Sequence, residues 1–151
     1  MRTVIFTVST CLAFVLLAGR AVGQDQDHPS FSGTWQLDAS KSELHSGKVS
    51  SAVWVIAEGD NSIHISQSEN GKPKKTELQC TTDGKECKFP GDRRDSFWFN
   101  GSMLVDMETK SDHVTRFRLK ISEDGKVLTV EVTPIVPQSG KADTLVFQKQ
   151  T

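Results

Sequence analysis

The sequence predicts an all-β domain, an antiparallel meander that closes into a barrel. Apolar and polar residues alternate with period two, turn signals recur about every ten residues, and no long segment has helical periodicity. A β-sandwich is the structural alternative, because alternation alone does not separate a sandwich from a barrel. The expected strands are 33–38, 49–58, 62–69, 75–81, 85–90, 95–99, 102–110, 113–122, 126–134 and 142–150.

The turns and the alternation both favour sequential hairpins. Asn-Gly at 70–71 and 100–101 and Asp-Gly at 83–84 supply residues that accept the positive φ angles of tight turns. Between the turns, apolar residues at alternate positions of 117–121 and 128–132 are interleaved with polar ones. One apolar and one polar face is typical of an antiparallel sheet that covers a core.

The N-terminal 23 residues read as a secretory signal peptide. Arg2 gives a positive start, an apolar run follows, and Ala21-Val22-Gly23 is a small-x-small cleavage pattern. An uncleaved anchor is disfavoured, because the apolar run is shorter than the roughly 20 residues that a membrane span needs. The predicted organisation is a signal peptide at 1–23, a flexible leader at 24–32 and a single domain at 33–151.

Charge and targeting limit the partners. The full chain has a net charge of −1, and removal of Arg2 and Arg20 leaves 16 basic against 19 acidic residues, a net charge of −3. This balance argues against nucleic-acid binding. We expect an exported protein, periplasmic or extracellular, that is monomeric and has no stable membrane anchor.

Two cysteines remain after cleavage, Cys80 and Cys87. If Asp83-Gly84 is a two-residue hairpin loop, the two cysteines lie directly opposite each other, about 5.5 Å apart at Cα. An exported protein permits a disulfide, and we predict one here. The spacing matches no metal-binding knuckle, which argues against a metal or redox site.

Four segments together resemble secreted bacterial lipocalin-like (calycin-type) β-barrel proteins, most of unassigned function. They are FSGTWQLDASKS (31–42), TTDGKE (81–86), ISEDGKVLTVEV (121–132) and DTLVFQKQ (143–150). The resemblance covers most of the mature chain and implies an up-and-down barrel of eight to ten strands that binds a small apolar molecule. It also implies that Trp35, in Gly-x-Trp, closes one barrel end under a basic residue from a late strand, for which Lys149 is the candidate.

A barrel of this size is either filled by its own side chains or holds one ligand, and the sequence leaves both open. Trp54 and Trp98 fall on the opposite phase from the predicted lining. They are expected outside or at the rim, unless a bulge shifts the phase. The irregular segment Ala39–Val49 is expected near one end as a lid. With Trp35, the predicted ligand-binding residues are Val53, Val55, Ile63, Ile65, Phe97, Phe99, Met103, Val105, Phe117, Leu119, Leu128 and Val130.

The function predicted is that of an exported binding protein that holds a small hydrophobic ligand, with no cofactor, no metal and no catalysis. The four histidines show no metal spacing, no nucleophile motif is present, and Glu43 with His45 is only a weak acid/base pair. The alternative is a protein-interaction or inhibitor-type barrel with a filled core. In that case Trp54 and Trp98 would be exposed and adjacent.

Overall fold

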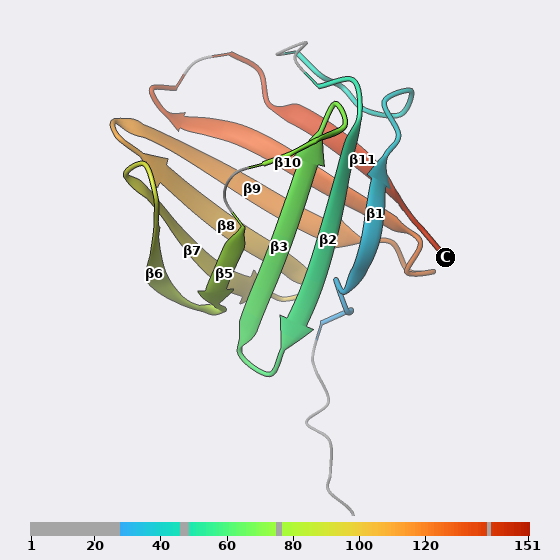
Figure 1. Cartoon of the computed structure of the whole chain (residues 1–151), viewed down its shortest axis with the longest axis horizontal. Coiled ribbons are helices and arrows are strands. Elements are labelled where there is room, and N and C mark those ends of the chain that lie inside the picture. Colours follow the sequence, from blue (N-terminus) through green and yellow to red (C-terminus); the bar gives the residue numbers. More distant parts are fainter. Residues whose placement is uncertain (1–27, 46–48, 75–76, 139) are drawn as a thin grey trace, which may run out of the picture.

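The computed structural model describes residues 28–45, 49–74, 77–138 and 140–151, and it contains a single curled antiparallel sheet (Figure 1). The predicted signal peptide and residues 24–27 of the predicted leader lie outside these residues. Eleven strands occur in the described parts of the chain. They are β1 (Gly33–Leu37), β2 (Ala52–Gly59), β3 (Ser62–Glu69), β4 (Lys72–Pro73), β5 (Leu78–Thr81), β6 (Asp83–Phe89), β7 (Arg93–Asn100), β8 (Met103–Lys110), β9 (His113–Ile121), β10 (Val127–Val136) and β11 (Asp143–Lys149).

The strands follow one another around the barrel in the order β4-β3-β2-β1-β11-β10-β9-β8-β7-β6, with β5 paired to β3. Because β1 pairs with both β2 and β11, the first and last strands are neighbours. The prediction of an all-β meander that forms a barrel is confirmed. Ten of the strands correspond to predicted ones, and the additional strand is the two-residue β4.

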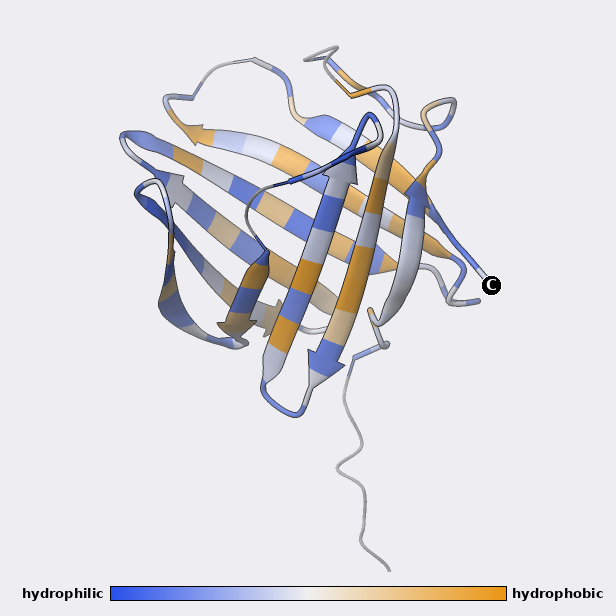
Figure 2. Cartoon of the chain, viewed as in Figure 1, coloured by the Kyte–Doolittle hydropathy of each residue, from blue (hydrophilic) through white to orange (hydrophobic). Residues whose placement is uncertain are grey.

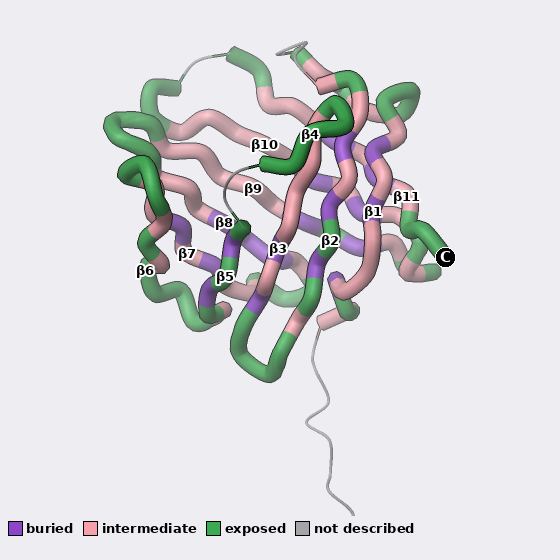
Figure 3. Tube along the Cα trace, in the orientation of Figure 1, coloured by how far each residue is buried: buried purple, intermediate pink, exposed green. Residues whose placement is uncertain are grey.

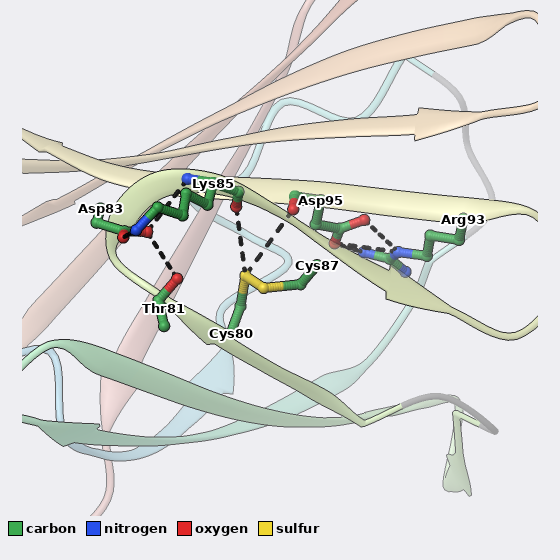
Figure 4. Close-up of a disulfide and its surroundings, with 7 residues drawn as sticks. All are labelled: Cys80, Thr81, Asp83, Lys85, Cys87, Arg93 and Asp95. Carbon is green, nitrogen blue, oxygen red and sulfur yellow. Dashed lines mark hydrogen bonds and ion pairs between the residues drawn. A yellow bond between two sulfur atoms is a disulfide. The ribbon is translucent and has the colours of Figure 1, made fainter.

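The closure of the barrel between β5 and β6 differs from the other steps. β5 pairs with β3 and β6 pairs with β7, and no ladder joins β5 to β6 in the described residues. The link is the disulfide between Cys80 and Cys87, whose Cα atoms are 5.7 Å apart (Figure 4). The predicted disulfide is confirmed, but the predicted hairpin register is wrong. Cys80 is opposite Ile63 and Cys87 is opposite Asp95. The backbone of β5 pairs with β3 and that of β6 pairs with β7, so the two cysteine strands do not face each other as a hairpin.

One end of the barrel, near the 59–62, 100–103 and 121–127 turns, is densely filled, and we call it the closed end. The part of β3 next to the 59–62 turn, which contains its two isoleucines, is buried, whereas its other end is more exposed (Figures 2 and 3). Trp35 is fully buried, and its indole Nε1 donates a hydrogen bond to the Phe31 carbonyl oxygen at 2.9 Å. Lys149 Nζ lies 5.2 Å from the centroid of the Trp35 ring, which is the place the family resemblance implied for a late basic residue.

The prediction of a flexible leader is corrected for residues 28–32. Phe31 is fully buried, since the Glu58 carboxylate anchors the segment. Glu58 Oε2 accepts hydrogen bonds from the Phe31 backbone N–H at 2.6 Å, from the Ser30 hydroxyl at 2.9 Å and from the Ser32 backbone N–H at 3.2 Å. The His28 ring stacks on Phe99, with centroids 3.4 Å apart. Phe31 therefore belongs to the hydrophobic core that fills the closed end.

Substitution Glu58→Ala removes the acceptor that these donors share. We expect a decrease in the free energy of unfolding of about 1.5–3 kcal/mol, the range for hydrogen bonds to a charged group. Urea denaturation followed by tryptophan fluorescence measures the change. Glu123→Ala, at an exposed turn, is the matched control. Equal stability of the two variants would contradict the anchoring role of Glu58.

Loss of the disulfide removes the cross-link between β5 and β6 and leaves the backbone at Thr82 as their covalent connection. For the short loop between Cys80 and Cys87, the double variant Cys80→Ala/Cys87→Ala should lose about 2–3 kcal/mol of unfolding free energy. Wild type in reducing agent should lose a similar amount, whereas the double variant should not respond to the reductant. A wild-type midpoint that is unchanged by reduction would contradict this prediction.

Candidate functional site

The half of the barrel opposite the closed end contains a cavity of about 180 Å³. This open end is where β3 ends and where β7 and β11 begin. The interior is thus filled in one half and hollow in the other, which resolves the alternatives left open by the sequence. The cavity-lining apolar residues are Leu44, Val49, Trp54, Ile65, Leu78, Phe97, Phe117, Leu119, Val132 and Leu145.

Nine of the thirteen predicted ligand-binding residues face the interior, but they divide between the two halves. Ile65, Phe97, Phe117 and Leu119 line the cavity. The others pack into the closed half and do not reach it. These are Trp35, Ile63, Leu128 and Val130, which are buried, and Phe99, which is half-buried.

Four predicted lining residues lie on the outer face, so their assignment is wrong. Val53 and Val55 share a phase on β2 whose outward direction is shown by Val55, which is 46% exposed. Met103 and Val105 take the outer phase of β8, and Val105 is covered because it lies opposite Trp98 and Arg118. The causes differ: the run Ala52–Ala57 of β2 is apolar on both phases and gives no alternation from which the phase can be read, whereas in β8 the more apolar phase faces outward.

Trp54 was expected outside and is instead an interior residue. It is 7% exposed, lines the cavity, and packs against Phe147 with ring centroids 4.9 Å apart. Trp98 is half-buried on the outer phase of β7. The two tryptophans are therefore on opposite sides of the barrel wall and do not form the exterior aromatic pair that the interaction hypothesis needs.

The inward phase of β8 carries acidic residues, which the sequence analysis missed. Leu104, Asp106 and Glu108 face the interior, because Leu104 and Asp106 lie opposite Phe99 and Phe97 of β7. Asp106 is 4% exposed and lines the cavity, and its Oδ1 has no hydrogen-bond partner among the described residues. The available signal was the interruption of an apolar strand by an acid at the position after Val105.

Arg93 on β7 connects the carboxylates of this wall. Its Nε and Nη2 donate to Asp95 Oδ1 and Oδ2 at 2.8 and 2.6 Å, and its Nη2 lies 2.9 Å from Glu108 Oε2. Figure 4 shows Arg93 and Asp95 beside the disulfide. Asp95 is fully buried and pairs in register with Cys87, so the disulfide-linked β6 supports the ion pair.

Burial raises the pKa of Asp106 well above the usual range of a carboxyl, and the negative charges of Asp95 and Glu108 add to this increase. The positive charge of Arg93 opposes it only in part. Asp106 therefore keeps its proton at pH values where an exposed aspartate has lost it. A protonated Asp106 can both donate and accept a hydrogen bond at the cavity wall.

The open end of the cavity is polar. Glu69 and Lys74 form an ion pair there at 2.6 Å. A polar groove of about 510 Å³ adjoins the cavity and shares Lys74, Arg93 and Glu108 with it. The predicted lid segment does lie at this end: Glu43 forms a backbone bridge with Thr144, and Leu44 and Val49 line the cavity.

The described residues, 28–45, 49–74, 77–138 and 140–151, contain neither a metal-binding cluster nor a helix that could span a membrane. No group of three or more histidines, cysteines and carboxylates in this part of the chain is arranged to hold a metal ion. The same residues include no helix long and apolar enough to cross a membrane.

Comparison with known proteins places the fold. No family model and no curated protein matches the chain. Solved structures that are similar include fatty-acid-binding protein 1 of Echinococcus granulosus, with TM-score 0.64 and 14% identity over 80% of this chain and 98% of that one. Wild-type fluorescent protein UnaG gives TM-score 0.63 at 15% identity over 80% and 97%. The Manduca sexta fatty-acid-binding protein gives 0.58 at 15% over 79% and 99%. The chain therefore has a calycin-type β-barrel fold.

The raised pKa of Asp106 predicts how stability depends on pH. Between the ordinary carboxyl pKa of the unfolded chain, about 3.9, and the higher folded pKa, the native state binds the extra proton. This contribution to stability is complete below about pH 4 and is lost as the pH rises, with a slope of at most about 1.4 kcal/mol per pH unit. Asp106→Asn has no titrating group at this position and so lacks this pH-dependent contribution. The unfolding free energy of the variant minus that of wild type should therefore increase from pH 4 upward.

Urea denaturation at several pH values between 4 and 8 measures this difference. Asp60→Asn, at an exposed turn, is the matched control and should give a difference that does not change with pH. A difference for Asp106→Asn that is constant, or that decreases as the pH rises, would contradict the assigned burial of Asp106.

Proposed function

We propose that this protein is an exported binding protein that holds one small, largely apolar ligand in the open half of its barrel. The observation that carries the proposal is the unequal filling of the interior. Large buried side chains pack the closed half, whereas the open half keeps a cavity of about 180 Å³ that is lined, among the described residues, by ten apolar and seven polar or charged ones.

The size of the cavity indicates the size of the ligand. An engineered apolar cavity of about 150 Å³ binds benzene, so 180 Å³ fits a ring with a short chain. Burial of about 150 Å² of apolar ligand surface contributes roughly 4 kcal/mol at 25 cal/mol per Å². The fatty-acid-binding proteins of similar fold support an apolar ligand in general terms, although their low identity carries no particular ligand over to this chain.

Binding is proposed rather than catalysis because of the composition of the wall. The described residues that line the cavity include no serine, threonine, cysteine or histidine, the side chains that most often act as nucleophiles. Arg93 is held by two carboxylates. Export is proposed from the signal-like residues 1–23 and agrees with the disulfide, since such bonds persist in oxidising compartments.

The test is titration with 4-phenylbutan-1-ol, a neutral ligand with one ring, followed by calorimetry or by amide chemical shifts. Val132→Phe places a ring in the cavity and should weaken binding at least tenfold. Val55→Phe is the matched control, because Val55 is on the outer face and its variant should bind as wild type does. Absence of binding to wild type, or equal weakening by both variants, would overturn the proposal.

A further inference from the structure

We propose that the polar end of the ligand is a protonated amine received by Asp106, so that the cavity prefers an arylalkyl amine to the matched carboxylic acid. This inference rests on the proposed function and deepens it by naming the chemical class of the ligand. Three observations support it: Asp106 lies in the cavity wall, carboxylates outnumber cations around it, and Arg93 is already paired with Asp95 and Glu108.

Asp106 lies where the polar end of an apolar ligand would meet the wall. It projects inward between Phe97 of β7 and Phe117 of β9, its register partners, and all three line the cavity. The carboxyl is 4% exposed, and the buried Oδ1 has no hydrogen-bond partner in the described residues. Burying a polar atom without a partner costs about 1–3 kcal/mol, which a donor on the ligand would recover.

The charges around the cavity favour a cation. Asp106 is acidic, and among the described lining residues whose side chains face it or the open end of the cavity, Glu69 and Glu108 are acidic, and Lys74 and Arg93 are basic. Lys74 is paired with Glu69, and the buried Asp95 behind the wall adds a further carboxyl beside Arg93. An ammonium group would reduce this imbalance, whereas a carboxylate would increase it.

Arg93 is the cation in the cavity wall with which a carboxylate ligand would pair, but it already forms ion pairs with Asp95 and Glu108. Asp95 accepts two hydrogen bonds from it, and Glu108 lies 2.9 Å from its Nη2. A ligand carboxylate would be a third anion on one guanidinium, beside Asp106. The structure therefore disfavours acids at the same place where it favours amines.

Amine binding has a proton balance that can be measured. The amine enters as an ammonium ion, Asp106 gives up its proton to solvent, and an ion pair forms with no covalent change. In the described part of the chain, the titratable and charged groups that face Asp106 are Asp95 and Arg93 of β7 and Glu108 of its own strand. Across the cavity, Glu69, Lys74 and Asp143 are the described charged groups.

The experiment compares three ligands with one apolar body: 4-phenylbutylamine, 4-phenylbutan-1-ol and 4-phenylbutanoate, titrated into wild-type protein at pH 6. We expect the amine to bind at least tenfold more tightly than the alcohol, and the carboxylate to bind more weakly than either. If the alcohol binds and the amine has no advantage, or the acid binds best, the inference is overturned while the proposed function stands. If none binds, the proposed function itself fails.

A variant and a second measurement assign the preference to Asp106. In Asp106→Asn the dissociation constants of amine and alcohol should come within threefold of each other, whereas Asp60→Asn should keep the wild-type ratio. Calorimetry of wild type in two buffers of different ionisation enthalpy measures the protons released on binding. At a pH where the stability of Asp106→Asn relative to wild type shows that Asp106 is protonated, amine binding should release protons and alcohol binding none. Amine binding without proton release at that pH would overturn the assignment to Asp106.

Discussion

The joint between β5 and β6 is the constraint on which the rest of the barrel depends. Elsewhere the neighbouring strands are held by a backbone ladder, but here the described residues are joined by the Cys80–Cys87 disulfide. Cys87 is opposite Asp95, Asp95 holds Arg93, and Arg93 holds Glu108 on β8. The covalent link is therefore the first member of a chain of contacts that ends at the cavity wall. A domain of this size buries a limited hydrophobic core. The single disulfide between β5 and β6 therefore affects both the closure of the barrel and the geometry of its interior.

The sequence predicted the architecture well because the signals of an antiparallel meander, the alternation within each strand and the turn residues between strands, lie within a few residues of one another. On β9 and β10, strict alternation identified Phe117, Leu119, Leu128 and Val130 as interior residues. On β2 the run Ala52–Ala57 is apolar on both phases, and the choice between them depends on the barrel as a whole. The burial of Phe31 was also beyond local pattern, since its anchor, Glu58, is 27 residues away in sequence. The family resemblance supplied what pattern could not, the role of Trp35 and the position of Lys149 over its ring.

The most instructive departure is β8. Its more apolar phase, Met103, Val105 and Met107, faces outward, while the phase that contains Asp106 and Glu108 faces the interior. A sequence selected for stability alone would have the opposite orientation, and places where local pattern and fold disagree are commonly functional. The buried acid lowers stability at neutral pH and places a polar group between the cavity-lining rings of Phe97 and Phe117. The inward orientation of the acidic phase of β8 is the reason why the sequence pattern missed the candidate site, and it is also the feature that gives the cavity a buried carboxyl group.

The interior is divided along the barrel axis, and this division has a consequence for substitutions in the cavity. The closed half contains the residues that hold the sheet together, Phe31, Trp35 and Phe147 among them, whereas the open half contains the residues that would meet a ligand. Substitutions at separated sites that share no partners have nearly additive effects on stability. Most cavity positions can therefore be substituted with effects on folding that add to those of changes in the closed half. Trp54 is the exception, because its ring packs on Phe147 and joins the two halves.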